Sequence, residues 1–183
     1  MVPLTILPMQ TYTLEERAEQ LVRTEIQGTR KGSKIPAYKH SLNVAGTLRR
    51  HGFDGETILA GLLHDVVEDS HVTFDELANM GFSERTLRIV KLVTHDNDIP
   101  SGTVRWVKMI GRLIDANDIE AWTVKVADTL DNYRSSESLP SERRDFMRMV
   151  KAPLIVALTR DMLGHTKIWK ELDTEVKLKK ITR

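Results

Sequence analysis

The residues from His64 to Asp69 place one imidazole and three carboxylates within six consecutive positions. On a helix, which turns about 100° per residue, His64, Asp65, Glu68 and Asp69 would share one arc of about 140°. Like charges three or four positions apart repel, and no Lys or Arg lies among them to offset the repulsion. A bound cation would explain the pattern. The alternative is an amphipathic surface helix whose polar face is only solvated.

The ligand chemistry of this stretch favours a hard or borderline metal. An imidazole beside a carboxylate suits Mn, Fe, Mg or Zn better than a soft metal. His40 and Asp128 are candidates for further ligands from other parts of the chain. Asp128 lies between the apolar residues Val126 and Leu130, and a buried carboxylate needs a partner or a metal. The alternatives are an ordinary helical histidine at His40 and a buried aspartate paired with an arginine at Asp128.

Composition excludes several other kinds of site. The chain has 183 residues and no cysteine, which rules out disulfides, thiolate zinc sites, iron–sulfur clusters and cysteine nucleophiles. Lys and Arg number 27 against 26 Asp and Glu, so no overall field favours nucleic acid or a membrane. No apolar run is long enough to span a bilayer, and residues 1–9 lack the basic segment of a secretion signal. We therefore expect a cytoplasmic protein, whose oligomeric state the sequence leaves open.

Helix signals are frequent along the chain, and strand signals are scarce. Capping boxes open helices at Thr13 with Glu16 and at Thr73 with Glu76, and Ser83 caps another helix. The expected helices cover residues 13–27, 38–50, 54–69, a short stretch from 73, 83–93, 104–114, 122–135 and 142–163, followed by a helical tail from residue 166. The prediction is an all-α fold and one domain over residues 1–183, with its core at about 13–164.

The remaining segments are predicted from turn residues and from apolar spacing. Loops are expected over residues 28–37, 96–102 and 136–141. A kink is expected at Pro153, because proline removes a backbone donor from a helix. The apolar face of the helix over 104–114 is predicted from the spacing of Val104, Val107, Ile110 and Ile114.

In chain order, His40, the doublet His64-Asp65 and the distant Asp128 resemble the signature of the HD superfamily of metal-dependent phosphohydrolases. The doublet alone occurs by chance in many sequences. The longer motif HDxxED at residues 64–69 is more specific, and it is similar to the hydrolase domain of RelA/SpoT homologues. The resemblance implies a single HD-domain helical bundle of the small stand-alone alarmone hydrolase type.

Three further segments extend this similarity from about residue 13 to 164. They are the KVADxLxN motif at 125–132, Arg30-Lys31 followed by Pro36-Ala37-Tyr38-Lys39-His40, and Ala152-Pro153-Leu154. The family has Pro-Tyr closely after Arg-Lys, whereas here Ala37 separates Pro36 from Tyr38. The position that contacts the base can therefore be either Arg30 or Lys31.

The resemblance implies an activity and a cofactor. The activity is hydrolysis of guanosine 3′,5′-bis(diphosphate), the (p)ppGpp alarmone of the stringent response, at its 3′-pyrophosphate by a metal-activated water. The cofactor is one Mn²⁺, although the ligand set alone would also allow Fe²⁺, Zn²⁺ or Mg²⁺. The expected metal ligands are His40, His64, Asp65 and Asp128.

Other residues would handle the water and the nucleotide. Glu68 and Asp69 stand one helical turn from the ligands, and we assign them to orienting or deprotonating the water and to the proton of the leaving group. By the resemblance, Asn132 would bond the sugar or a phosphate. Arg30 or Lys31 would lie against the purine, where a guanidinium stacks better than an ammonium.

Two sets of residues are weaker candidates. Arg143, Arg144 and Lys151 could hold the pyrophosphate, but a solvated basic helix face is the simpler interpretation. His71 and His95 are further candidate ligands, yet an ordinary loop histidine is the commoner case, so one metal is favoured over two.

Three other functions stay open at this point. The chain could be another HD phosphohydrolase that acts on a 5′-nucleotide or a different phosphate ester. It could be a catalytically inactive regulator that binds a nucleotide or a metal. It could also be a helical interaction protein without a site. Metal content and product analysis separate these functions.

Overall fold

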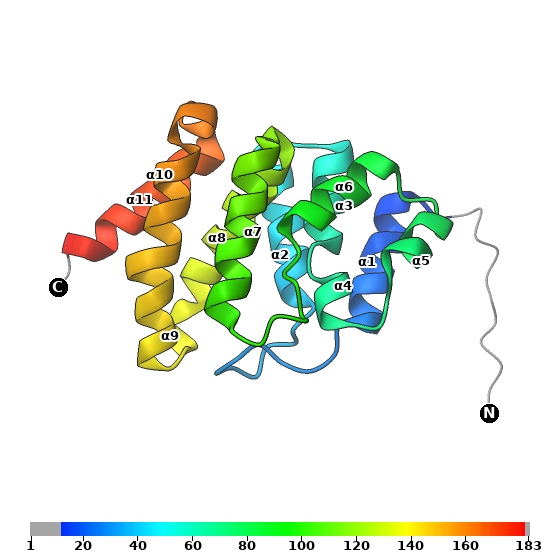
Figure 1. Ribbon diagram of the computed structural model, residues 1–183, viewed down its shortest axis with the longest axis horizontal. Coiled ribbons are helices and arrows are strands. Elements are labelled where there is room, and N and C mark those ends of the chain that lie inside the picture. Colours follow the sequence, from blue (N-terminus) through cyan, green and yellow to red (C-terminus); the bar gives the residue numbers. More distant parts are fainter. Residues whose placement is uncertain (1–11, 182–183) are drawn as a thin grey trace.

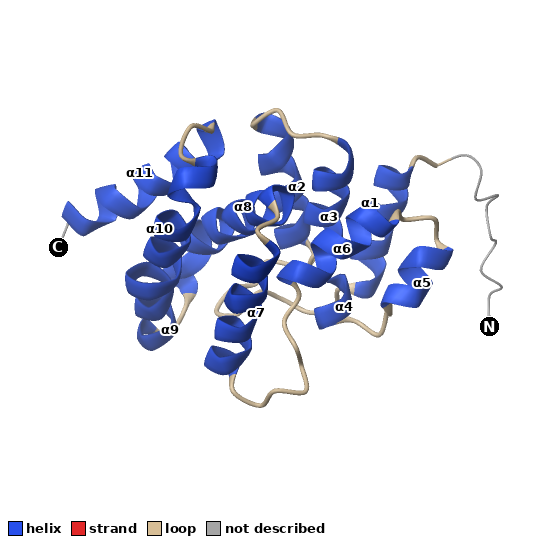
Figure 2. Ribbon diagram, turned by 45° about the horizontal axis from the view of Figure 1, so that its top comes forward, coloured by secondary structure: helices blue, strands red, loops and turns tan. Residues whose placement is uncertain are grey.

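The computed structural model describes residues 12–181 of the chain. Its regular elements are helices joined by loops (Figures 1 and 2), and the extended pairing among the described residues is one isolated bridge between Thr29 and Pro36. The all-α prediction is confirmed. The elements are α1 (Leu14–Glu25), α2 (Lys39–Arg50), α3 (Gly55–Leu63), α4 (Val66–Asp69), α5 (Phe74–Asn79), α6 (Glu84–Val93), α7 (Gly102–Ala116), α8 (Ile119–Ser135), the 3₁₀ turn η1 (Ser136–Ser138), α9 (Ser141–Phe146), the π turn η2 (Met147–Lys151), α10 (Ala152–Leu163) and α11 (Lys167–Ile181).

Helices α2, α3 and α8 form the centre of the molecule. They pack on one another, while α1 and α6 pack on α3, and α10 and α11 pack on α8. Figure 1 accordingly places α10 and α11 at one end and α1 and α5 at the other. The core between the central helices contains Leu48, Leu62, Leu63, Leu130 and Tyr133, each exposed by 1% or less. Burial of one such side chain contributes about 1.5–3 kcal/mol, so this packing fixes the helices that carry the candidate ligands.

The predicted helix starts are confirmed where a side chain caps the backbone. Thr13 with Glu16 and Thr73 with Glu76 form complete capping boxes, and Ser83 accepts a hydrogen bond at the start of α6. These side chains satisfy amide groups that the first helical turn leaves without partners.

Helix α8 begins earlier than predicted, at Ile119 rather than at Trp122. Asn117 adopts a left-handed conformation with φ 46°, and the Asp118 side chain then caps the helix by accepting two backbone N–H groups. Arg85 of α6 donates to the same Asp118 carboxylate. The Asn-Asp pair is thus a turn followed by a cap, which apolar spacing alone does not indicate.

The prediction of one continuous helix over residues 54–69 is wrong, because the helix breaks at His64 and Asp65. Helix α3 ends at Leu63 and α4 begins at Val66. Asp65 has φ −100° and ψ −5°, in the sparsely populated bridge region. The His64 ring bonds the Gly61 carbonyl, so a side chain competes there with the helical ladder. Because of this break, His64 and Asp65 do not lie on one face of a continuous helix with Glu68 and Asp69, as the sequence predicted.

The predicted apolar face of α7 is only partly correct. Ile110 is buried, but Val104, Val107 and Ile114 are 45%, 55% and 50% exposed. The buried face is instead Trp106, Met109, Ile110 and Leu113. This helix carries two apolar stripes in its sequence, and the one that contains the large Trp106 ring faces the core.

The region from Ser136 to Leu163 contains more separate helical elements than predicted. The expected loop over 136–141 contains η1 and leads directly into α9. Instead of one continuous α-helix over 142–163, the π turn η2 separates α9 from α10 and ends at Lys151, two residues before Pro153, where the kink is expected. Pro153 falls in the first turn of α10, where the missing N–H needs no partner.

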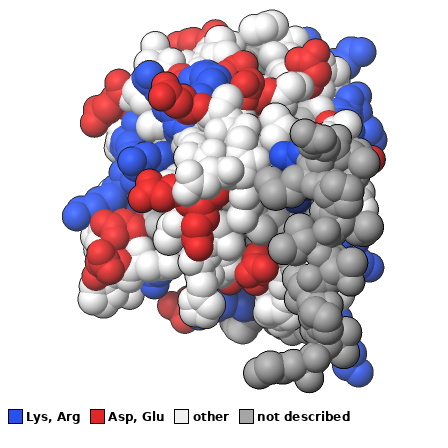
Figure 3. Space-filling view, turned by 90° about the vertical axis from the view of Figure 1, so that its right-hand side faces the viewer, with Lys and Arg blue, Asp and Glu red and all other residues white. Residues whose placement is uncertain are grey.

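The surface carries both signs of charge. The face at the α1 and α5 end shows basic and acidic side chains intermixed over its described part (Figure 3), as the nearly balanced composition predicts. Among residues 12–181, no helix is long and apolar enough to cross a membrane.

Candidate metal centre

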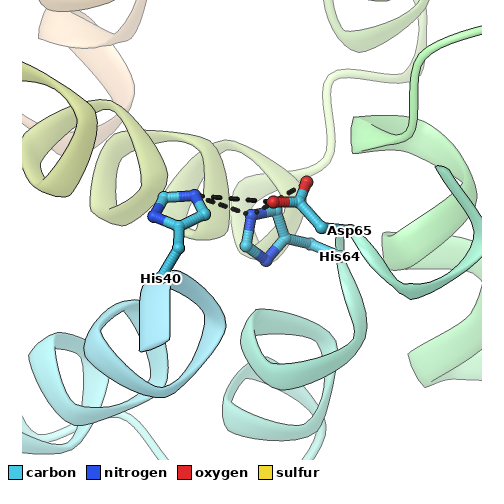
Figure 4. A group of neighbouring side chains, drawn as sticks. All are labelled: His40, His64 and Asp65. Carbon is cyan, nitrogen blue, oxygen red and sulfur yellow. Dashed lines mark hydrogen bonds and ion pairs between the residues drawn. The ribbon is translucent and has the colours of Figure 1, made fainter. Parts of the chain in front are cut away.

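His40, His64 and Asp65 meet between the central helices (Figure 4). His40 is the second residue of α2, and His64 and Asp65 form the break between α3 and α4. One ligand atom from each of the three residues lies within 4.8 Å of the other two, a spacing compatible with one shared metal ion. His40 and His64 are each 4% exposed, and the Asp65 side chain is 27% exposed. The cluster is therefore buried on the imidazole side and open on the carboxylate side.

The two imidazoles face each other through their Nε2 atoms, which are 3.3 Å apart. Asp65 places carboxylate oxygens 3.2 Å from Nε2 of His64 and 3.6 Å from Nε2 of His40. The other ring nitrogens are occupied: Nδ1 of His64 donates to the Gly61 carbonyl at 2.9 Å, and Nδ1 of His40 donates to Asp131 at 2.6 Å. In each neutral ring, Nε2 then carries a lone pair. Lone pairs and carboxylate oxygens face one another, an arrangement that requires protons or a cation between them.

The pKa shifts follow from this crowding. Burial alone lowers the pKa of His40, but hydrogen bonds to Asp128 and Asp131 and nearby negative charge raise it to about 9. The pKa of His64 is also raised, because the Asp65 charge outweighs the effect of burial. The pKa of Asp65 is lowered to about 2, since the positive charge on His64 outweighs the burial of its carboxyl. The cluster therefore attracts positive charge strongly.

Asp128, in the middle of α8, borders the three-residue cluster. Its Oδ1 lies 3.0 Å from Nε2 of His40 and 3.9 Å from Nε2 of His64. Its Oδ2 accepts from Nζ of the buried Lys125 at 2.8 Å, and Asn132 donates to Oδ1. Burial raises the pKa of Asp128, but the charge on Lys125 holds it well below its usual range. One oxygen thus faces the cluster while the other belongs to a buried ion pair, in which the basic partner is a lysine and not the arginine of the alternative interpretation.

Glu68, on α4, is held by a residue of the following loop. It accepts from the His95 backbone N–H at 3.0 Å and from Nδ1 of His95 at 2.9 Å. Burial raises the pKa of Glu68, but the hydrogen bond from His95 outweighs this and lowers it. Asp69 differs, because burial of its carboxyl and the charges of Asp65 and Glu68 raise its pKa to about 6. The two neighbouring carboxylates therefore differ in how readily they take up a proton.

Arg30 and Asn132 lie directly beside the cluster. Nη2 of Arg30 donates to the Asn132 side-chain carbonyl at 2.7 Å and to Ser135 at 3.0 Å. Asn132 in turn donates to Asp128, so these polar groups form one chain from the loop to the buried carboxylate. Of the two basic candidates, Arg30 is the one bonded to α8, whereas the side chain of Lys31 is exposed and makes no hydrogen bond to the described residues.

The loop that carries Arg30 is fixed by its own backbone. The amide of Arg30 donates to the Ile35 carbonyl at 2.9 Å, next to the bridge between Thr29 and Pro36. Gly32 has φ 75°, and a Cβ there would lie 1.9 Å from the backbone oxygen of Ser138. The loop therefore packs tightly on η1, which holds Arg30 at the end of α8.

The weaker candidate residues differ in their exposure and in their contacts with the site. His71 is exposed and lies outside the three-residue cluster. Arg143 is exposed, and Nε of Arg144 pairs with Asp145 at 3.6 Å. His95 approaches the site through Glu68 and not through the other two histidines.

Sequence reasoning missed two residues of the site. Asp131 orients His40, and its position three residues after Asp128 on one helix face was a visible signal. His95 was considered only as a ligand, and nothing in the local sequence indicates that it bonds Glu68 across 27 positions. Such contacts arise from tertiary packing.

Comparison with known proteins agrees with this geometry. The family described as HD domain matches residues 18–153. A probable guanosine-3′,5′-bis(diphosphate) 3′-pyrophosphohydrolase from Synechocystis is 37% identical over 133 residues, covering 68% of this chain and 17% of that protein. The guanosine-3′,5′-bis(diphosphate) 3′-pyrophosphohydrolase of Aquifex aeolicus is 32% identical, covering 70% of this chain and 18% of its own length. The chain thus spans less than a fifth of these relatives.

Solved structures show the same fold. A metazoan ortholog of SpoT that hydrolyses ppGpp superposes with a TM-score of 0.77 at 22% identity, over 92% of this chain and 96% of that one. The protein lmo0812 from Listeria monocytogenes superposes with a TM-score of 0.65 at 28% identity, over 78% of this chain and 96% of that one. The match over residues 18–153, together with these similarities, shows that the chain belongs to the HD-domain family.

Proposed function

We propose that this chain hydrolyses guanosine 3′,5′-bis(diphosphate), and its triphosphate analogue, at the 3′-pyrophosphate with the help of one divalent metal ion. One observation carries the proposal: the Nε2 atoms of His40 and His64 face each other and the Asp65 carboxylate at 3.2–3.6 Å, next to a pair of acidic residues. The substrate is suggested by the names of the Synechocystis and Aquifex relatives.

The metal ligands in this proposal are His40, His64, Asp65 and Asp128. Both Nδ1 atoms are already used for hydrogen bonds within the protein, so both Nε2 lone pairs are free to bind an ion. Asp128 can offer Oδ1 while its Oδ2 keeps the bond to Lys125. A divalent ion bound there would polarise a phosphoryl oxygen and lower the pKa of a water molecule. We favour Mn²⁺, and the mixed nitrogen and oxygen donors also suit Fe²⁺, Zn²⁺ or Mg²⁺.

Glu68 and Asp69 are proposed to handle water and protons. The bonds from His95 hold the Glu68 carboxylate ionised and in a fixed orientation, which suits a group that orients or deprotonates the attacking water. Asp69 lies next to it and is proposed to share this task or to give a proton to the leaving group. Burial of its carboxyl and the neighbouring charges of Asp65 and Glu68 raise the pKa of Asp69 to about 6, so it takes up a proton more readily than Glu68 does.

Arg30 and Asn132 are proposed to bind the nucleotide. The guanidinium of Arg30 is held against α8 by Asn132 and Ser135, which keeps its plane in one place for stacking on a purine. Asn132 is fixed between Arg30 and Asp128 and is proposed to bond the sugar or a phosphate. Lys31 is the second candidate for the base. A nucleotide substrate of this kind also fits a cytoplasmic protein whose partner is a small molecule and not nucleic acid or a membrane.

Product analysis tests the proposal. The purified chain is incubated with MnCl₂ and guanosine 3′,5′-bis(diphosphate), and the products are separated by anion-exchange chromatography, with the Asp128→Ala variant purified in parallel to exclude a contaminating hydrolase. We expect guanosine 5′-diphosphate and pyrophosphate in equal amounts. Release of orthophosphate, or turnover of a 5′-nucleotide instead, would identify a different phosphohydrolase.

Two further outcomes would also overturn the proposal. Tight binding of the nucleotide without any release of phosphate would identify a regulator that has lost turnover. A protein that retains neither metal nor nucleotide would be a helical interaction protein. Metal content measured after gentle purification separates these two results.

A further inference from the structure

Lys151 is the last residue of the π turn η2, and its ammonium group lies against two aromatic rings. Its Nζ is 5.5 Å from the ring centroid of Trp106 on α7 and 5.5 Å from that of Phe146 on α9. The two rings pack edge to face, with centroids 6.0 Å apart. An ammonium over a ring face is attracted by the ring quadrupole, so the pair holds the end of this side chain in place.

The π turn directs Lys151 inward. Met147, at the start of the turn, is buried, and Lys151, at its end, is partly buried, whereas Met149 and Val150 between them are 53% and 42% exposed. Pi turns are rare and often occur at functional sites. Here Lys151 lies on the less exposed side of the turn, together with Met147.

The charge of Lys151 is not neutralised locally. Among the residues that the structure describes, no carboxylate oxygen lies within 4.0 Å of its Nζ, although Lys125 nearby is paired with Asp128. Burial, together with the positive charge on Lys125, lowers the pKa of Lys151 to about 8, although Asp128 and Glu68 act in the opposite direction. Lys151 is therefore a partly buried residue whose ammonium has no carboxylate partner, on a turn that packs on α8.

We infer that Lys151 binds the 3′-diphosphate of the nucleotide, an inference that rests on the proposed function. The turn that carries Lys151 packs on α8, the helix that supplies Asp128 and Asn132 to the candidate site, and the group to be cleaved must bind next to these residues. An ammonium is a strong donor to a phosphate oxygen, and the phosphate supplies the negative charge that the protein itself does not. The other basic residues of this region differ from Lys151: Arg143 is exposed, Arg144 pairs with Asp145, and Arg148, which lies over the Tyr133 ring, pairs with Glu137.

Lys151→Met tests this inference, because methionine keeps an unbranched apolar stem against Trp106 and Phe146. Lys151→Arg restores the charge, and Lys170→Met, an exposed lysine of α11, is the matched control. The measurements are KM for guanosine 3′,5′-bis(diphosphate) and the Kd for inorganic pyrophosphate with MnCl₂. We expect both constants to rise roughly ten- to a hundredfold in Lys151→Met, as for loss of one charged hydrogen bond, and to recover in part in Lys151→Arg.

The inference is overturned if Lys151→Met keeps both constants within twofold of the wild type, as Lys170→Met should. A lower melting temperature with unchanged constants would show that the lysine only packs on its rings. If Lys151→Met does not fold, KM and Kd are instead compared between Lys151→Gln, which removes the charge, and Lys151→Arg, which keeps it. A wild-type protein that turns over no guanosine 3′,5′-bis(diphosphate) refutes the proposed function, whereas normal turnover with unaffected variants refutes only the role of Lys151.

Discussion

Asp131 on α8 orients His40 on α2 through a hydrogen bond of 2.6 Å from Nδ1 to Oδ2. The other oxygen of the same carboxylate accepts from Asn43 at 3.1 Å, and Nη2 of Arg30 lies 3.8 Å from Oδ2. One carboxylate thus joins two central helices and the loop of Arg30. Because Nδ1 is occupied, His40 can present only Nε2 to the candidate metal centre.

Removing this carboxylate should weaken metal binding without removing a ligand. In Asp131→Ala the His40 ring loses the partner that fixes its orientation and tautomer, and we expect Mn²⁺ affinity to fall about 10–100-fold. A competition titration against a chelating dye measures the change. Asp161→Ala, which removes an exposed carboxylate from α10, is the control and should bind like the wild type. Unchanged affinity in Asp131→Ala would show that this hydrogen bond does not organise the centre.

Substitution of Asp128 and of Glu68 should separate metal binding from proton handling. Asp128→Ala removes a proposed ligand and leaves Lys125 buried without its partner, so we expect metal and activity to be lost together. Glu68→Ala removes no ligand, and we expect it to keep the metal while the turnover rate falls on the order of a hundredfold or more. Elemental analysis and kcat are measured on the same preparations. Near-normal turnover in Glu68→Ala would show that its assigned role is wrong.

His95 should act only through Glu68. It donates to that carboxylate through both its backbone and its ring, and the structure gives it no contact with His40 or His64. We expect His95→Ala to lower kcat by less than Glu68→Ala, and to have no further effect when Glu68 is already alanine. His71→Ala, at an exposed loop histidine, is the matched control. Additive losses in the double variant would instead give His95 a role of its own.

Local sequence signals predicted most of the helices because they act over short distances. A threonine with a glutamate three residues later satisfies two amides of the same turn, so the boundaries at Thr13 and Thr73 could be read directly. The approach of His40 to the His64-Asp65 doublet was predicted as well, although from family resemblance. Helical spacing alone does not bring together residues 24 positions apart.

The misjudged features depend on competition between distant groups. The break at His64 arises because its ring takes the Gly61 carbonyl and its own carbonyl lies 3.4 Å from the Thr94 hydroxyl, 30 positions away. The face of α7 was misread because two apolar stripes share that helix, and packing of Trp106 against Phe146 selects one of them. Neither Thr94 nor Phe146 belongs to the segment whose structure it influences, so the sequence of that segment alone does not reveal the contact.

Metal binding should release protons. Burial lowers the pKa of His40, but its bonds to Asp128 and Asp131 raise it to about 9, and the pKa of His64 is raised too. At a pKa of about 9 the His40 ring is protonated at pH 7 in the metal-free protein, and the shift of His64 has the same direction, whereas a ligand imidazole must be neutral. Mn²⁺ affinity should therefore increase as the pH rises towards 9 and decrease as it falls.

Calorimetric titration with Mn²⁺ at pH 7, in HEPES and in Tris, measures this release, because the two buffers take up protons with different heats. We expect the observed heats to differ in proportion to the protons released. Asp131→Ala should release fewer protons than the wild type, since His40 then loses one of the hydrogen bonds that raise its pKa. Asp161→Ala should match the wild type. Identical heats in both buffers would mean that the ion displaces no proton, and His40 would then not be one of its ligands.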